Sequence, residues 1–332
     1  MKIKVFAPAT VANLIVGFDT LGAALADVEG SLFGDVVTIE SAQEPGIQVQ
    51  GSYAHKLPKD PKRNLVTSCC SAFHQKLLDK GQKVRPFLLT LEKNLPVCSG
   101  LGSSAASIVA ALVALNTFYK DALSPEELML LAGQMEGIVS GTPHYDNIAP
   151  ALLGGLQLMQ PGGSCVPLPF FENWLLVLYH PGIKISTRMA RDILPKNLPR
   201  GAVIPYWQKL AGFIRGLYTG DQALAESLLY DDVIEPYRAN LIPRFEAGKK
   251  AALETGAVAF GVAGSGPTCF AIVHSMDKAV AVRSAIVGEM HGTPESFSKI
   301  CRISPQGARI LYTPRTSNSG GIKFRDSPSV TY

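Results

Sequence analysis

Three short stretches in the first third of the chain have the hydrophobic pattern of β-strands. Residues 2–6 alternate polar and apolar side chains, residues 36–39 are all β-branched, and residues 87–91 form an apolar run bounded by Pro86 and Lys93. Alternation, β-branching and short bounded apolar runs are typical of strands. The sequence therefore predicts three strands before residue 92.

Two helices are predicted after these strands. The first begins after Gly102 and ends near Tyr119, over a run of small and apolar residues. The second begins at Ser124, where Ser-Pro-Glu-Glu supplies an N-cap, a first-turn proline and a capping-box glutamate, and it carries Glu136 near its end. The longest apolar run, residues 105–115, is about half of the roughly 20 residues that a membrane-spanning helix needs, so no membrane segment is expected.

The second half of the chain also mixes strands and helices, and a change of composition separates it from the first. The 332 residues favour two domains, and the Pro- and Gly-rich stretch between residues 159 and 173 is typical of a connecting loop. We predict an N-terminal domain over residues 1–162, a C-terminal domain over 163–312 and a disordered tail over 313–332. Strands are expected at 174–179, 258–260 and 269–273, and helices near 186–194, 207–218 and 221–230.

Composition and charge exclude several classes of protein. The formal net charge of +4 comes from scattered basic residues, so no nucleic-acid partner is expected, and a mildly positive surface suits an anionic substrate. Only 17% of residues are charged, below the roughly 25% of typical proteins, and a homodimer is one expectation that follows. The six cysteines form no CxxC pair, which argues against a zinc site or a disulfide framework and favours the reducing cytoplasm.

The strongest chemical signal is the segment 95–106, Leu-Pro-Val-Cys-Ser-Gly-Leu-Gly-Ser-Ser-Ala-Ala. Gly100 and Gly102 allow the backbone to approach an anion, and the helix that follows points its positive end at the same place. The hydroxyls of Ser103 and Ser104 are placed to meet phosphate or Mg²⁺. A tight strand-to-helix turn is the plain alternative. The segment lacks the Gly-Lys-Ser/Thr of a P-loop and the full dinucleotide fingerprint, so neither class is supported.

This segment resembles the second motif of the GHMP kinases, the family of galactokinase, homoserine kinase, mevalonate kinase and phosphomevalonate kinase. Residues 7–13 with Gly17-Phe-Asp19 resemble the first motif, and residues 261–268 resemble the third, so the resemblance covers about residues 1–312. It implies an α+β fold, with an N-terminal domain like the second domain of ribosomal protein S5, a ferredoxin-like C-terminal domain, and ATP bound in the cleft between them.

Three further segments resemble the homoserine kinase branch of the bacterial type: residues 12–22, His144-Tyr-Asp-Asn147 and Glu235-Pro-Tyr-Arg238. The implied activity is the ATP-dependent phosphorylation of the L-homoserine side-chain hydroxyl, a step of threonine biosynthesis. Two alternatives stay open. One is another GHMP kinase acting on a sugar or mevalonate, and the other is a relative that binds ligands without catalysis.

The resemblance also implies roles for single residues. Homoserine carries a carboxylate, an ammonium and a hydroxyl. Arg191 and Arg238 would bind the carboxylate in the bidentate geometry that suits guanidinium, Asp19 the ammonium and Asn13 the hydroxyl. Asn13 and Asp19 are the implied catalytic residues, and whether Asp19 acts as a base or only positions substrate is left open. The implied substrate pocket is completed by His144, Asn147, Thr187 and Gly264.

The ATP and metal sites follow from the same resemblance. Glu136 with Ser103 would bind Mg²⁺, because this ion prefers carboxylate oxygens and keeps phosphate oxygens and water as its other ligands. Solvated surface charges are the plain alternative for Glu136 and Arg191, and a turn residue is the alternative for Asn64. ATP binding is implied for Asn64, Pro96, Val97, Cys98, Ser99, Gly100, Leu101, Gly102, Ser103, Ser104, Ala105 and Ala106.

Overall fold

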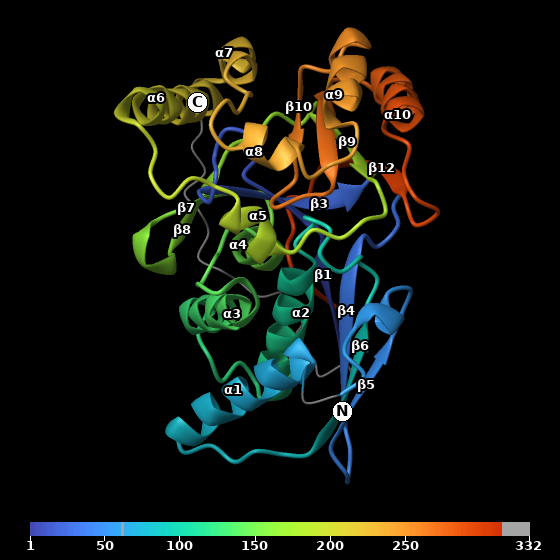
Figure 1. Ribbon diagram of the computed structural model, residues 1–332. Helices are drawn as coiled ribbons and strands as arrows, with labels where there is room; N and C mark the ends of the chain where they lie inside the picture. The colour runs from blue at the N-terminus through green and yellow to red at the C-terminus, as the bar shows by residue number, and fades with distance from the viewer. Residues whose placement is uncertain (61–62, 314–332) are drawn as a thin grey trace.

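The computed structural model describes residues 1–60 and 63–313, and it contains two sheets with helices packed against them. In Figure 1, α1, α2 and α3 lie beside the sheet that contains β1, β4, β6 and β5, while α9 and α10 lie toward the opposite end of the molecule. The α+β class is confirmed. The predicted tail falls almost wholly on residues 314–332, which lie outside the described residues.

The first sheet has the order β13-β1-β4-β6-β5, and the central helix α2 packs on it. The residues of α2 itself are small and apolar on nearly all of its sides, and almost all of them are buried. A helix that is apolar all round is stable only inside a protein. α2 begins at Ser103, directly after Gly102 as predicted, and the capping box at Ser124 opens α3 as predicted. The elements of this half are β1 (Lys2–Pro8), β2 (Thr10–Ala12), β3 (Leu21–Asp27), β4 (Gly34–Ser41), β5 (Gly46–Gln50), α1 (Leu65–Asp79), β6 (Phe87–Glu92), α2 (Ser103–Phe118), α3 (Pro125–Ser140), α4 (Ile148–Leu153) and β7 (Leu156–Met159).

The second sheet contains a ferredoxin-like unit. Four of its strands follow the order β12-β9-β11-β10, with α9 before β10 and α10 between β11 and β12, which is the βαββαβ arrangement of that fold. The ferredoxin-like prediction is therefore confirmed. The elements of this half are β8 (Cys165–Leu168), β9 (Leu175–His180), α5 (Thr187–Asp192), α6 (Arg200–Thr219), α7 (Gln222–Ser227), α8 (Glu235–Ala239), α9 (Phe245–Glu254), β10 (Ala259–Val262), β11 (Cys269–Val273), α10 (Met276–Met290), β12 (Phe297–Ile303) and β13 (Arg309–Tyr312).

Each sheet includes strands from both sides of residue 162. β3 pairs with β12 in the second sheet, and the last strand, β13, returns to pair with β1 in the first. The division at residues 162 and 163 stays a prediction. The predicted loop at 159–173 is wrong in part, because β8 forms there; it pairs with β7 at the edge of the sheet, where a proline such as Pro167 is tolerated.

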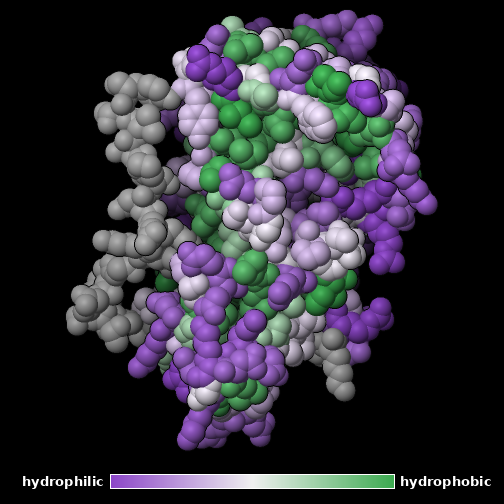
Figure 2. Space-filling model, turned by 90° about the vertical axis from the view of Figure 1, so that its left-hand side faces the viewer, coloured by the Kyte–Doolittle hydropathy of each residue, from purple (hydrophilic) through white to green (hydrophobic). Residues whose placement is uncertain are grey.

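Exposed apolar side chains are found on the described surface. Hydrophobic residues gather on the upper half of the face shown in Figure 2, while the lower half is mostly hydrophilic. On α6, Trp207 is 65% exposed and Ile204 is 42% exposed. The homodimer remains a prediction.

Among the helices described, none is both long and apolar enough to cross a bilayer.

Candidate active site

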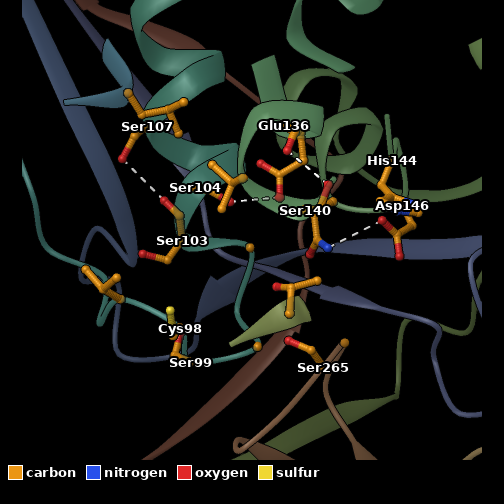
Figure 3. Close-up of a pocket in the computed structure, with 18 of the residues that line it drawn as sticks. Cys98, Ser99, Ser103, Ser104, Ser107, Glu136, Ser140, His144, Asp146 and Ser265 are labelled. Carbon is orange, nitrogen blue, oxygen red and sulfur yellow. Dashed lines mark hydrogen bonds between the residues drawn. The ribbon is translucent and has the colours of Figure 1, made fainter. Parts of the chain in front are cut away.

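A cavity of about 310 Å³ lies where the N-terminal end of α2 faces α3, the start of α5 and the loop that follows β2. Figure 3 shows Ser103, Ser104 and Ser107 on one side of this site and His144 and Asp146 on another. Four predicted ATP-site residues, Pro96, Leu101, Ala105 and Ala106, are buried and do not line the cavity. The predicted residues that do line it are Asn13, Asp19, Asn64, Val97, Cys98, Ser99, Gly100, Gly102, Ser103, Ser104, Glu136, His144, Asn147, Thr187, Arg191, Arg238 and Gly264.

The loop before α2 is fixed by backbone hydrogen bonds to three distant segments. The carbonyl of Leu101 accepts from the N–H of Thr10 at 3.2 Å, that of Ser99 from Thr268 at 3.1 Å, and that of Cys98 from Ile185 at 3.3 Å. These contacts join all three sequence motifs around one cavity wall. The loop is therefore held in place by contacts within the protein itself.

Two glycines of this loop are required by its close packing. Gly100 and Gly102 have φ of 81° and 62°, in the left-handed region that favours glycine. A Cβ atom on Gly100 would lie 2.3 Å from the carbonyl oxygen of Ala263, and one on Gly102 would lie 1.9 Å from Oγ1 of Thr10. From the sequence, we expected these glycines to let the backbone approach an anion. The structure shows a second reason for glycine at both positions, because neighbouring chain segments pack too closely for a Cβ atom.

A buried ion pair supports the first turn of α2. Lys93 and Asp35 form this pair, and Nζ of Lys93 also donates to the carbonyl of Ser103 at 2.7 Å and to Oγ of Ser107 at 3.0 Å. The side chains of Lys93 and Asp35 are 3% and 0% exposed. The hydrogen bonds of Lys93 fix the first turn of α2. Removing either partner of the ion pair would leave an uncompensated buried charge, so both residues are needed there. The sequence analysis did not identify either residue.

Glu136 projects from α3 toward the same helix terminus. Its Oε1 accepts from Oγ of Ser104 at 2.9 Å, whereas its Oε2 is buried and has no partner among the described residues. Burial raises the pKa of Glu136 above its ordinary value. Oγ of Ser103, the predicted companion of Glu136, donates instead to the carbonyl of Leu95 at 3.3 Å. A buried carboxylate with a free oxygen favours a cation as its missing partner.

At the other end of the cavity, Asp19 and Arg191 form a bidentate ion pair. Nη1 of Arg191 donates to Oδ2 of Asp19 at 3.0 Å and Nη2 donates to Oδ1 at 2.7 Å. Nη2 of Arg191 also lies 3.3 Å from Nδ1 of His144. Burial lowers the pKa of His144, and the charge of Arg191 lowers it further, so this histidine is neutral near pH 7. Thr187, at the start of α5, lines the same region.

Arg238 lies beside this pair without a carboxylate partner in the described part of the chain. Its Nη1 donates to the carbonyl of Gly264 at 2.6 Å, and its Nε is buried with no hydrogen-bond partner among residues 1–60 and 63–313. The ring of Phe18 lies under both arginines, with its centroid 4.9 Å from Cζ of Arg238 and 5.8 Å from Cζ of Arg191. Burial lowers the pKa of Arg238, although arginine still stays charged.

Three polar residues fix the backbone around the cavity. Asn13, at φ 72°, donates from Nδ2 to the carbonyl of Gly264 at 3.1 Å and accepts at Oδ1 from the N–H of Asp19 at 3.0 Å. Oδ1 of Asn147 accepts from Oγ1 of Thr10 at 2.7 Å. Asn64 is the N-cap of α1 and accepts from the N–H of Val66, so the turn alternative holds for it while it also lines the cavity.

Comparison with known proteins identifies the family. Residues 64–155 match the GHMP kinases N terminal domain, and residues 213–291 match the GHMP kinases C terminal domain. The crystal structure of homoserine kinase from Cytophaga hutchinsonii is 33% identical over 93% of this chain and 97% of that one, with a TM-score of 0.83. The chain belongs to the GHMP kinases.

Two other structures show the same GHMP kinase fold. Mevalonate kinase of L. major, in complex with R-mevalonate, is 20% identical over 90% of this chain and 96% of that one, with a TM-score of 0.66. Phosphomevalonate kinase of Streptococcus pneumoniae is 14% identical over 90% of this chain and 99% of that one, with a TM-score of 0.67. As a member of this family, the protein is a phosphotransferase that acts on a small molecule. GHMP kinases use ATP, typically with a divalent metal.

The site of this GHMP kinase fits a magnesium ion held with nucleotide. The described residues contain no group of three His, Cys, Asp or Glu side chains that would enclose a metal alone. Mg²⁺ does not need one, since it usually takes one or two carboxylates and keeps phosphate oxygens and waters as its other ligands. The orphan Oε2 of Glu136 and the adjacent hydroxyl of Ser104 supply that kind of partial shell.

Asp146, like Lys93, is a charged residue of the cavity wall that the sequence analysis did not identify. Asp146 lies between His144 and Asn147, inside a segment that had been quoted for its resemblance, and it is only 7% exposed. The only indication of a role in the sequence was that an ionisable side chain stands between two residues already assigned to the substrate pocket. Thr10 was missed in the same way, inside the first motif. Nothing in the residues next to either one marks it, and only the fold shows that Asp146 lines the cavity and that Thr10 donates to Asn147 there.

Proposed function

We propose that this GHMP kinase is a homoserine kinase, which transfers the γ-phosphoryl group of ATP to the side-chain hydroxyl of L-homoserine and forms O-phospho-L-homoserine. The reaction would serve threonine biosynthesis in the cytoplasm. The observation that carries the proposal is the concentration of charged groups of both signs, Asp19, Asp146, Arg191 and Arg238, at one end of the cavity. A zwitterionic alcohol suits such a wall better than a neutral sugar does.

The 33% identity to the Cytophaga hutchinsonii homoserine kinase, over nearly the whole of both chains, supports the same substrate. The mevalonate and phosphomevalonate kinases share the fold at 20% and 14% identity, so fold alone does not favour homoserine over mevalonate. The charged residues therefore carry the choice. A relative without catalysis is the less favoured alternative, because Glu136, Ser104 and the loop before α2 are all in place.

Catalysis would consist of positioning and charge stabilisation, because phosphoryl transfer passes through a loose transition state that requires little activation of the hydroxyl. The loop before α2 and the N-terminal turn of that helix would hold the phosphates. Glu136 and Ser104 would hold the magnesium ion, which neutralises charge on the phosphates when bound. Asn13 and Asn147 would orient the hydroxyl. Both oxygens of Asp19 accept from Arg191, which favours a positioning role for Asp19 over that of a base.

Product analysis tests this function. The protein is incubated with Mg²⁺, ATP and L-homoserine, and phosphorus NMR follows the new phosphate ester. We expect a phosphomonoester signal that matches O-phospho-L-homoserine and grows together with ADP. Formation of phosphomevalonate or a sugar phosphate in parallel incubations, with homoserine left unchanged, would overturn the assignment. A protein that binds ATP and turns over none of these substrates would support the alternative without catalysis.

A further inference from the structure

The backbone is strained in the segment between β2 and β3, residues 13–19, which we call the strained segment. Four of its residues that are not glycine have φ in the left-handed region: 72° at Asn13, 40° at Leu14, 66° at Ile15 and 57° at Asp19. Asparagine and aspartate tolerate this region, but a β-branched residue such as isoleucine is rarely found there. Such strain persists only where the surrounding structure holds the backbone in place.

The strained segment carries several groups of the candidate active site. Asn13 is the residue proposed to orient the acceptor hydroxyl, and Asp19 forms the bidentate ion pair with Arg191. The ring of Phe18 lies under this arginine and under Arg238. A change in the backbone of the strained segment would therefore displace several groups of the site together.

A tyrosine on α6 holds the main chain of this segment. The phenolic oxygen of Tyr206 accepts a hydrogen bond from the N–H of Phe18 at 3.0 Å. Tyr206 is not among the residues that line the cavity, so its contact with the site runs through the backbone of the strained segment. Burial raises the pKa of Tyr206, and the negative charge of Asp231 raises it further. The side chain is therefore a neutral phenol near pH 7.

The packing of α6 fixes the ring of Tyr206. Three buried residues, Lys209, Phe213 and Leu217, follow it at helical spacing, so all four lie along one face of the helix. Nζ of Lys209 lies 5.5 Å from the centroid of the Tyr206 ring, and Lys209 is itself held by an ion pair with Asp232. The phenolic oxygen is thus presented to the strained segment by an ordered helix.

We infer that Tyr206 is a positioning residue for phosphoryl transfer, which acts through the N–H of Phe18 to keep Asn13 directed at the acceptor hydroxyl. Without this hydrogen bond, the strained segment relaxes more easily toward conformations with less backbone strain. The fraction of molecules with a competent acceptor site then falls. The inference rests on the proposed function for its acceptor, L-homoserine, and adds a residue that lies outside the cavity wall.

The experiment compares Tyr206→Phe with the wild type, because phenylalanine keeps the ring and its charge and removes only the acceptor oxygen. We expect kcat/KM for L-homoserine to fall about three- to tenfold, as for one lost hydrogen bond, while Kd for ATP and the melting temperature stay unchanged. Amide hydrogen exchange at Phe18, followed by NMR, should become faster in the variant.

Tyr230→Phe is the matched control. The ring of Tyr230 also lies against Lys209, with its centroid 4.2 Å from Nζ, but this tyrosine is exposed and does not line the cavity. The control should keep the kcat/KM of the wild type and its exchange rate at Phe18. An equal loss in both variants would overturn the inference, because it would indicate a general effect of the surface around Lys209.

Two other outcomes would also overturn the inference. One is a normal kcat/KM for homoserine in Tyr206→Phe. The other is a loss accompanied by equally weakened ATP binding or a lower melting temperature, because it would indicate a role in the fold alone. The proposed function is judged separately, on the wild type. If the wild type phosphorylates R-mevalonate and not homoserine, the proposed function fails, and a three- to tenfold loss of that activity in Tyr206→Phe would still support the inference.

Discussion

The two ends of the cavity are built in different ways: the proposed phosphate end is the loop before α2 with Glu136, and the proposed substrate end is the wall formed by Asp19, Asp146, Arg191 and Arg238. At the phosphate end, backbone hydrogen bonds and close-packed glycines fix a continuous loop, and one buried carboxylate, Glu136, reaches it. At the substrate end, charged side chains from four separate segments meet, and some of them compensate one another before a ligand binds. The first design suits a ligand that the whole family shares, and the second suits selection among substrates. Variants at the two ends should therefore fail in different ways.

The largest effect is expected at the phosphate end. Glu136→Gln should lower kcat by about two to three decades, because the charge that would hold the metal is removed while the shape is kept. Thermal stability should not fall, since burial raises the pKa of Glu136 and the neutral amide is less costly to bury. Steady-state kinetics and a thermal melt measure the two quantities.

Glu127→Gln provides the matched control on the same helix. Glu127 belongs to the capping box of α3 and pairs with Lys80, far from the cavity wall. This variant should keep normal kcat and show only a small change in melting temperature. A wild-type kcat for Glu136→Gln at saturating Mg²⁺ would contradict the metal role and remove the contrast between the two ends.

At the substrate end, Arg238→Ala should raise KM for homoserine while ATP binding stays unchanged. Loss of a charge-assisted contact costs about 1.5–3 kcal/mol, or one to two decades in kcat/KM. 3-Aminopropanol, which is homoserine without its carboxylate, should be a poor substrate of the wild type, and its kcat/KM should fall little further in the variant. Arg188→Ala, an exposed arginine on α5, is the control. Equal losses on both substrates would show that Arg238 acts through the fold.

A pH effect of about tenfold should be specific to the substrate end. The carboxyl of Asp146 has a pKa raised to about 7 in the empty protein, so it becomes protonated as the pH falls from 8 to 6. The negative charge of the ionised form adds to the attraction of the cavity for a cationic group, and KM for homoserine, which carries an ammonium, should therefore be about tenfold higher at pH 6 than at pH 8. Asp19, Arg191 and Glu136 also face this group. The same profile measured on Asp146→Asn should be flat, and an unchanged profile would assign the titration to a neighbour.

The smallest effect distinguishes two adjacent serines. Ser104→Ala removes the hydrogen bond to Glu136 and should lower kcat/KM for ATP about fivefold, the equivalent of about 1 kcal/mol. Ser103→Ala removes only a 3.3 Å contact to the carbonyl of Leu95 and should change kcat/KM by less than about twofold. The opposite ranking would support the Ser103 ligand expected from the sequence. Coupled kinetics at varied ATP concentrations measure both variants.

The same difference between the ends explains what the sequence could predict. The loop before α2 is one continuous segment, and helix boundaries at Gly102 and Ser124 follow local rules, so sequence reasoning found them. The resemblance to the family also brought together most residues that line the cavity. What it could not give is which charges pair. Asp19 and Arg191 are 172 positions apart, and nothing local to either residue indicates their contact.

Burial was the second quantity that sequence patterns concealed. Lys93 follows a strand and would be solvated in most proteins, yet it is buried because Asp35 and the first turn of α2 surround it. Asp146 is similar, since it is buried and lines the cavity in the fold, where β3 packs on its backbone at Gly22. Long-range packing, rather than local preference, decides both positions.

The central claim is that the charged end of this cavity selects a small zwitterionic alcohol. A coupled assay of ADP release measures it most directly, with L-homoserine, γ-hydroxybutyrate, R-mevalonate and galactose compared at fixed Mg²⁺ and ATP. The account predicts that kcat/KM for homoserine exceeds that of each other compound by roughly a hundredfold or more, because each lacks at least one of the two charges that the wall would compensate. Turnover of R-mevalonate or galactose at a rate equal to or above that of homoserine would contradict it.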